Sequence, residues 1–302
     1  LYGASDGASN WYHTLSDKLK EMGYEKMHND VCMFRHPITK HKVGTHVDDI
    51  IAKGTAEDNQ KIFKEMDRLF GMKSWQIVSL ENSVMHCGKQ ISMHKDKEGK
   101  LWYRISQQEA LEDWLQEEGM LGVRPVSSPM PDRKELFSDL RSVNEKEHKW
   151  IRAAVGSMSY FTCETRTDCA QEVNRLAQCL ESPTQGTIKA IKRVMAYLAG
   201  TTDRSLLVPI TTNNEWLAFS DSDHAGDRRM DTRSRTGVLI MLNGMPIHWQ
   251  SVKQPVTALS STEAEIYALS ETIKAVKHRY WIAEELGTAV TWPAQVKCDN
   301  SA

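Results

Sequence analysis

The stretch Trp216-Leu217-Ala218-Phe219-Ser220-Asp221 is an apolar run of strand length that ends in a carboxylate. Two further strand-like segments lie between 238 and 250, joined by Asn243-Gly244, a dipeptide typical of tight hairpin turns. A long helical segment follows from about 262 to 286, and a last strand runs from 295 to Asp299. Because a strand after a helix can pair beside the first strand through a crossover, this order predicts a mixed sheet.

Three acidic residues occupy matching places on these predicted elements. Asp221 follows the first strand, Glu265 lies near the start of the helix, and Asp299 ends the last strand. Converging carboxylates form the oxygen-rich site that Mg²⁺ or Mn²⁺ prefers. Glu263 and Glu265 are two positions apart on a helix, so only one of them can face such a site. Since the chain has 40 acidic residues, the alternative is that all of these are ordinary surface acids.

A second pair of acids, Asp48-Asp49, interrupts the strand-like segment 42–53 and favours a turn there. Adjacent carboxylates repel each other unless a cation lies between them. Two divalent ions about 3.5–4 Å apart can activate an attacking hydroxyl and stabilise a leaving phosphate oxygen. The simpler alternative is a solvated hairpin turn, in which Asp is a common residue.

The rest of the chain is predicted to be largely helical. A strand is expected at 31–36, and three of the nine prolines fall within 123–134, which predicts a linker. The spacing of apolar residues predicts helices at 10–22, 55–70, 107–118 and through most of 150–201. At the start of the second helix, Thr55 and Asp58 resemble a capping box.

Bulk composition narrows the class of protein. The 302 residues suggest about two domains, and 40% hydrophobic residues with a net charge of −2 are ordinary for a globular protein.

The six cysteines show neither a C-x-x-C pair nor Cys/His zinc spacing, which favours reduced thiols in a cytoplasmic or nuclear protein. No stretch has the ~18 apolar residues of a membrane helix, and no signal peptide is visible. Since the first residue is Leu1, we expect a fragment.

Short segments resemble copia-type reverse transcriptases. His46-Val47-Asp48-Asp49-Ile50 is similar to the family's Y-V-D-D-I turn. Further matches follow in the family's order at Leu1-Tyr2-Gly3, Trp11-Tyr12, Phe70-Gly71-Met72-Lys73, Cys87-Gly88-Lys89-Gln90-Ile91, Ile105-Ser106-Gln107, Val155-Gly156-Ser157-Met158-Ser159-Tyr160 and Thr165-Arg166-Thr167-Asp168.

The C-terminal part resembles the RNase H domain of the same family. Residues 219–227 are similar to its Y-x-D-A-D-W-A-G-D, and residues 233–237 to its R-S-T-S-G. Ser260-Ser261-Thr262-Glu263-Ala264-Glu265 is similar to its S-S-x-E-A-E, which selects Glu265 over Glu263. The resemblance covers essentially the whole chain.

The resemblance implies an α+β fold in three parts. Residues 1–124 would be reverse-transcriptase palm and thumb-like structure, truncated at the N-terminus. Residues 125–212 would be a helical connection, and residues 213–302 a mixed-sheet RNase H-like domain that lacks its end. Implied partners are an RNA template, DNA and an RNA–DNA hybrid, together with the integrase, protease and capsid segments of the polyprotein.

The implied activities are RNA-directed DNA synthesis and cleavage of the RNA strand of the hybrid, with Mg²⁺ or Mn²⁺ as cofactor. Metal-binding and catalytic roles would fall on Asp48, Asp49, Asp221, Glu265 and Asp299. Contacts to nucleic acid would come from Trp11, through its segment, and from basic residues beside the second metal site, because such side chains bind phosphates. These are Arg228, Arg229, Arg233 and Arg235.

Departures from the family pattern support a second hypothesis, a remnant that is inert or at most binds nucleic acid. His46 replaces the family's Tyr, and Ala4, Ser5 and Asp6 replace Leu-Lys-Gln. The family's third polymerase acid and fourth RNase H acid lie outside this sequence, so the chain alone is expected to be inactive. A third hypothesis is an unrelated two-metal nuclease, which would show no preference for hybrids.

Overall fold

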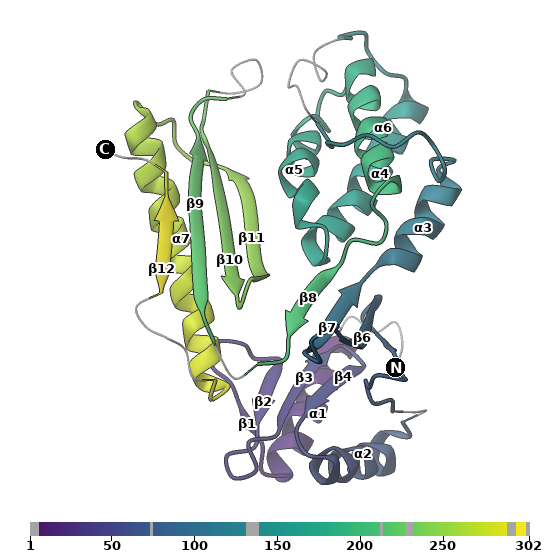
Figure 1. Cartoon of the computed structure of the whole chain (residues 1–302), viewed down its shortest axis with the longest axis vertical. Coiled ribbons are helices and arrows are strands. Elements are labelled where there is room, and N and C mark those ends of the chain that lie inside the picture. The colour runs from purple at the N-terminus through teal and green to yellow at the C-terminus, as the bar shows by residue number, and fades with distance from the viewer. Residues whose placement is uncertain are drawn as a thin grey trace.

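The computed structural model describes residues 6–72, 75–130, 139–211, 214–226, 232–288 and 294–299. These residues form three four-stranded sheets and a group of packed helices, so the predicted α+β class is confirmed (Figure 1). Within these ranges, no helix combines the length and the apolar character needed to cross a bilayer.

The first sheet is antiparallel, with strand order β1-β2-β3-β4. Helices α1 and α2 share an apolar core with it. Its elements are α1 (Gly7–Glu21), β1 (Glu25–Lys26), β2 (Met33–Arg35), β3 (Lys42–His46), β4 (Asp49–Lys53) and α2 (Ala56–Phe70). The core includes Leu15, Leu19, Phe34, Val43, Ile62 and Met66.

Local signals set the bounds of α2. The Thr55 hydroxyl oxygen accepts the Asp58 N–H at 3.1 Å, which satisfies one of the unpaired donors of the first turn. Gly71 ends the helix with φ 64, a left-handed conformation that glycine adopts without a Cβ penalty. The helix predicted at 55–70 is therefore confirmed.

The second sheet, with order β5-β6-β7-β8, is not predicted by the sequence patterns. Its last strand pairs with residues far back in the chain, because Ile105 lies opposite Leu206. Its elements are β5 (Val84–His86), β6 (Lys89–Lys95), β7 (Leu101–Ser106) and β8 (Leu206–Pro209).

Between β7 and β8 the described part of the chain forms four α-helices, which pack together (Figure 1). The predicted helical region begins at Glu145 rather than near 150, because Asn144 and Glu147 form a capping box. The helices are α3 (Gln108–Glu117), α4 (Glu145–Glu164), α5 (Ala170–Gln178) and α6 (Gln185–Ala199), with a 3₁₀ turn at Thr167–Cys169. Their core includes Leu111, Leu115, Ile151, Met158, Leu176, Ile191 and Met195.

The third sheet has the order β11-β10-β9-β12. As the sequence predicts, β12 runs parallel to β9, with Cys298 opposite Ser220, while the other pairs are antiparallel. The 25-residue helix α7 makes the crossover. The elements are β9 (Trp216–Asp223), β10 (Arg235–Leu242), β11 (Met245–Lys253), α7 (Ser261–Glu285) and β12 (Gln295–Cys298).

Helix α7 covers one face of this sheet. Trp216 and Ala218 of β9 pack with Val276 and Ala283 of α7 in one apolar cluster. Ser220 is buried like Trp216 and Ala218, and alternate residues of a strand share a face, so all three point toward α7.

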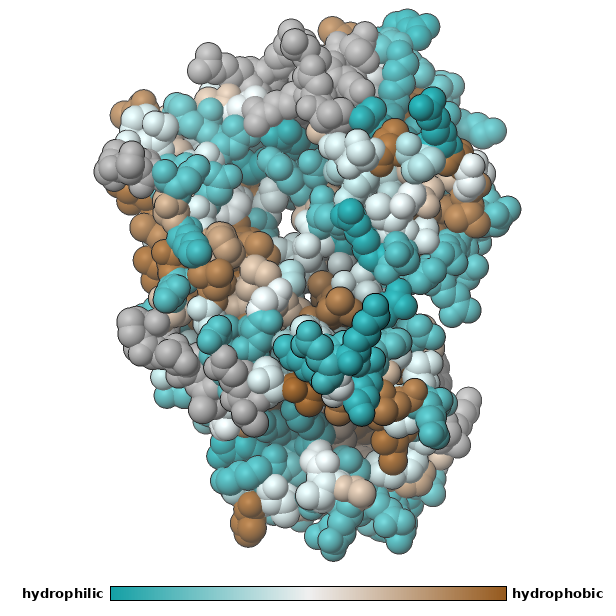
Figure 2. All heavy atoms as spheres, viewed as in Figure 1, coloured by the Kyte–Doolittle hydropathy of each residue, from teal (hydrophilic) through white to brown (hydrophobic). Residues whose placement is uncertain are grey.

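The outer side of α7 is partly apolar. Ile266, Ile273 and Trp281 are 63%, 44% and 44% exposed. Figure 2 shows apolar surface over the α7 side of the molecule.

Gln254 joins the end of β11 to the start of α7. Its buried Nε2 donates to Thr236 Oγ1 at 3.1 Å and to the Ala264 carbonyl at 3.0 Å. Its backbone N–H donates to the Ser234 carbonyl at 2.8 Å. The first turn of α7 is thereby held against β10.

Replacing Gln254 with Leu should destabilise the third sheet by about 1–3 kcal/mol, because two buried acceptors lose their donor. Hydrogen exchange of peptides from 232–288 measures the change in local unfolding free energy. The matched control is Gln250→Leu at an exposed position of β11, which should change this free energy by less than ~0.5 kcal/mol. Equal losses in both variants would contradict this role of Gln254.

His248 on β11 is a titratable group in the interface with α7. Its Nδ1 lies 3.0 Å from Nη2 of Arg279. Burial, with Arg279 and His278 nearby, lowers the pKa of His248 to about 4. The ring is therefore neutral in the folded protein at pH values where an unfolded histidine begins to bind a proton.

The stability of the third sheet should fall as the pH drops from about 6.5 toward about 4, because the unfolded chain binds a proton that folded His248 does not. Above about 6.5 this contribution is complete and constant. A His248→Gln variant should show a shallower loss in the same hydrogen-exchange measurement. His94→Gln, at an exposed site on β6, should leave the slope unchanged. An identical slope in wild type and His248→Gln would refute the assignment.

Candidate metal sites

The first candidate site lies where β9, β12 and the start of α7 meet. Ser260 caps α7 by accepting the Glu263 N–H at 3.1 Å, while the Glu263 carboxylate accepts the Leu259 N–H at 2.7 Å. Glu265 points to β9 instead. Its Oε1 accepts the N–H and the hydroxyl of Ser222 at 3.2 and 2.9 Å. The helix start therefore positions Glu265, and not Glu263, at the sheet.

Strand β12 delivers two more side chains to Glu265. The Cys298 thiol donates to Glu265 Oε2 at 3.7 Å. Ligand atoms of Glu265, Cys298 and Asp299 all lie within 4.8 Å of one another. This proximity follows from the parallel pairing, because Cys298 lies opposite Ser220 and Asp299 follows it at the end of the strand.

Asp221 lies beside this group on the strand but is not a member of it among the described residues. It is exposed, and strand alternation directs its side chain to the face opposite that of Ser220. Asp223 shares the Asp221 face, where its Oδ2 accepts a charged hydrogen bond from Arg175 Nη2 of α5 at 3.0 Å. The structure thus brings together two of the three predicted acids and leaves the Asp221 side chain on the opposite face of β9.

The four arginines that were predicted to contact nucleic acid differ in their surroundings. Arg228 and Arg229 lie outside the described residues. Arg233 is half-buried beside the strand. Arg235 is only 5% exposed, and its guanidinium donates to Asn174 Oδ1 of α5. Arg235 therefore packs between β10 and α5 instead of forming the exposed phosphate contact that the sequence suggests.

The second candidate site is the turn between β3 and β4. Asp48 and Asp49 are both exposed there, and His46 pairs with Asp49 across the hairpin. Val47 has φ 54, a left-handed conformation that is strained for a β-branched residue. Trp11 of α1 donates its indole N–H to the Val47 carbonyl and so supports the turn.

Trp11 also packs edge-to-face on Phe70, with ring centroids 4.9 Å apart. The indole N–H and part of the ring are therefore occupied by contacts with Val47 and Phe70. Its contact with nucleic acid stays a prediction.

His86 and Cys87, at the end of β5, lie against the Asp48-Asp49 turn. The Cys87 thiol donates to Asp49 Oδ2 at 3.5 Å and lies 3.4 Å from His86 Nε2. Burial and the hydrogen bond to Asp49 raise the pKa of Cys87. Burial lowers the pKa of His86, although the Asp49 charge opposes this shift. Without a bound cation, both side chains therefore favour their neutral forms.

Sequence reasoning missed the residues that complete these two clusters, Ser222, His86, Cys87 and Cys298. Cys298 directly precedes a predicted acid, so its position was available as a signal. His86 and Cys87 gave none, because they reach Asp49 only through the packing of one hairpin turn on another.

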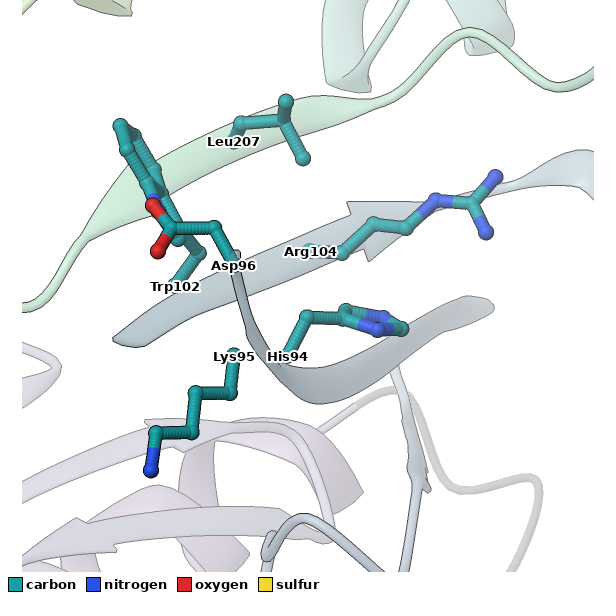
Figure 3. A pocket seen from close by; sticks show the side chains of 6 residues that line it. All are labelled: His94, Lys95, Asp96, Trp102, Arg104 and Leu207. Atoms are coloured by element: carbon teal, nitrogen blue, oxygen red, sulfur yellow. The ribbon is translucent and has the colours of Figure 1, made fainter. Parts of the chain in front are cut away.

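An open pocket of about 430 Å³ lies on β6, β7 and β8 (Figure 3). Within it the Asp96 carboxylate accepts the Trp102 indole N–H at 3.0 Å. Arg104 Nε donates to Ser205 Oγ at 2.9 Å. Its lining residues are His94, Lys95, Asp96, Trp102, Arg104 and Leu207. The Asp96 carboxylate is bound by Trp102, Arg104 binds residues outside the lining, and the side chains do not converge on a common point (Figure 3), so the pocket adds no metal site.

Comparison with known proteins gives one consistent class of relatives, although no family model matches the chain. It is 31% identical to the retrovirus-related Pol polyprotein from transposon RE1 of Arabidopsis thaliana, over 99% of this chain and 20% of that protein. It is 31% identical to the corresponding polyprotein from transposon TNT 1-94 of Nicotiana tabacum, over 95% of this chain and 22% of that protein.

A truncated Ty1-A Gag-Pol polyprotein of Saccharomyces cerevisiae is 26% identical over 95% of this chain and 24% of its own length. Among solved structures, a foamy viral protease-reverse transcriptase in complex with an RNA/DNA hybrid has a TM-score of 0.48 and 12% identity, covering 100% of this chain and 34% of that one. The chain spans about a fifth of the length of the plant relatives. The relatives that match 95–99% of this chain are copia/Ty1-type retrotransposon Pol polyproteins, and the chain is similar to one segment of them.

Proposed function

We propose that this part of the polyprotein carries acids for RNA-directed DNA synthesis and for hydrolysis of the RNA strand of an RNA–DNA hybrid. In this proposal residues 1–124 belong to the reverse transcriptase, 125–212 to a helical connection and 213–302 to an RNase H-like domain. Kinship with Pol polyproteins supports the assignment over nearly the whole chain.

The observation that carries the hydrolytic function is the meeting of Glu265 and Asp299 at the end of β9. The two carboxylates come from a helix and a strand that are adjacent only because β12 pairs parallel to β9. Their oxygens fit the preference of Mg²⁺ and Mn²⁺, whereas the Cys298 thiol is a poor ligand for hard cations. The donor set therefore fits a magnesium-type ion held by carboxylates.

Each residue has a distinct role in this proposal. Glu265 and Asp299 would hold the cation, and exposed Asp221, on the opposite face of β9, would reach it past the strand edge that β12 leaves uncovered beyond Ser220. Ser222 fixes the orientation of Glu265 through its two hydrogen bonds. The bound ion would activate water and stabilise the departing 3′ oxygen of the phosphodiester.

The same reasoning applies to the turn at Asp48 and Asp49. Both carboxylates are exposed at the tip of a hairpin, where an incoming phosphate can approach them. We assign them to the metal site of the DNA-synthesising part. Recognition of the nucleic acid would use helix shape and backbone phosphates rather than base sequence.

A second candidate function is that of a remnant which binds nucleic acid without cleaving it. The placement of Asp221 favours this alternative, because its side chain lies on the face away from Ser220. In that case divalent cations would bind weakly and without dependence on the three acids.

Mn²⁺ binding to the 302-residue chain, followed by electron paramagnetic resonance, tests the hydrolytic site. Wild type should bind Mn²⁺ saturably, and the double variant Asp221→Asn, Glu265→Gln should lose at least about tenfold in affinity, since two anionic ligands are removed. Glu263→Gln is the matched control, because Glu263 faces away from the site. Equal binding by wild type and the double variant would favour the remnant.

Cleavage of a labelled RNA–DNA hybrid in Mn²⁺ gives an independent readout. Any activity should disappear in the double variant, persist in Glu263→Gln, and be weaker on duplex DNA than on the hybrid. Similar cleavage of hybrid and duplex DNA would point instead to an unrelated two-metal nuclease.

A further inference from the structure

The second cluster contains a set of ligand atoms unlike that of a magnesium site. Asp49 offers a carboxylate oxygen, His86 an imidazole nitrogen and Cys87 a thiol sulfur, and these three atoms lie within 4.8 Å of one another. Magnesium prefers oxygen ligands, whereas thiolate and imidazole select zinc and other late transition metals. Sulfur and nitrogen beside one carboxylate therefore point to a different cation.

The two separations that involve the Cys87 sulfur match those of a tetrahedral zinc site, and the third pair of atoms lies within 4.8 Å. With Zn–S near 2.3 Å and Zn–N or Zn–O near 2.0–2.2 Å, adjacent ligand atoms of a tetrahedron lie about 3.5–3.7 Å apart. Cys87 Sγ lies 3.5 Å from Asp49 Oδ2 and 3.4 Å from His86 Nε2. The ligands therefore need only small shifts to close on an ion.

Helix α4 contacts the β5–β6 hairpin turn, which carries His86 and Cys87. Gly88 follows Cys87 with φ 71, and a Cβ there would lie 2.3 Å from the Tyr160 hydroxyl, so a side chain here would strain the backbone and displace Tyr160. The next residue, Lys89, forms an ion pair with Glu164 at 2.5 Å. The ion pair with Glu164 holds the turn in place. It also neutralises the positive charge of Lys89, the basic residue nearest to the cluster in sequence.

We propose that Asp49, His86 and Cys87 form a zinc-binding site, with a fourth coordination position open to water. On binding, the Cys87 S–H bond breaks, its proton passes to solvent, and the sulfur electron pair binds the ion. If Asp48 and Asp49 serve the proposed function in DNA synthesis, on which this consequence rests, zinc bound here would withdraw one of their two carboxylates from a magnesium-type ion.

Cobalt binding is the direct test, because Co²⁺ replaces Zn²⁺ and a cobalt–thiolate bond gives a charge-transfer absorption band. The full chain, kept reduced with a phosphine, should take up one zinc ion, and its cobalt form should show this band, which Cys87→Ser should abolish. Zinc affinity, measured by competition with a chromogenic chelator, should fall at least about tenfold in Cys87→Ser and in His86→Gln.

Two cysteine variants provide matched controls. Cys163→Ser removes an exposed thiol that belongs to neither cluster, and Cys298→Ser removes the thiol beside Glu265. Neither should change the signal that depends on Cys87. A band that persists in Cys87→Ser, or is lost equally in Cys163→Ser, would overturn the proposal.

Asp48→Asn separates the zinc site from the magnesium-type site. It should leave zinc binding intact, because Asp48 is not among the three ligands, while Asp49→Asn should weaken it. If Asp48→Asn and Asp49→Asn reduced zinc affinity equally, the ion would belong to the acid pair and the proposal would fail. Neither outcome bears on the cleavage of the hybrid that is proposed for the site at Glu265 and Asp299.

Discussion

The parallel pairing of β12 with β9 is the constraint on which the C-terminal part of the structure depends. A parallel neighbour requires a long crossover, and α7 supplies it across the face that Trp216 and Ala218 make apolar. The last ladder pair joins Cys298 and Ser220. Beyond it, Glu265 accepts the Ser222 N–H, so a carboxylate satisfies a backbone donor where the neighbouring strand has ended. The same side chain therefore completes the sheet edge and forms the candidate site.

Sequence patterns predicted the parts of this arrangement that depend on local signals. Asn243-Gly244 marks a hairpin because both residues adopt positive φ, 52 and 81, as the turn requires. The predicted helix that ends near 286 likewise stops at a local signal, because Gly287 adopts φ 66. The choice of Glu265 over Glu263 needed only helical geometry and the family resemblance.

Features made by distant segments could not be predicted in the same way. The strands of the second sheet carry mixed side chains, and β8 pairs with β7 across a long stretch of chain that contains α3 to α6. The face on which Asp221 lies depends on the register of β9, in which one residue separates the two sides. Cys87 meets Asp49 because two hairpin turns approach each other, and no spacing in the sequence records that approach.

The connection between β7 and β8 has a mechanical consequence. The chain leaves the second sheet at Ser106 and returns to it at Leu206 on the adjacent strand, so the helices between them are attached through two neighbouring strands (Figure 1). A double attachment resists twisting more than a single covalent tether. Because Arg175 and Asn174 of α5 also bind Asp223 and Arg235 of the third sheet, a movement of the helical group would disturb these contacts together with those of α4 at Gly88 and Lys89.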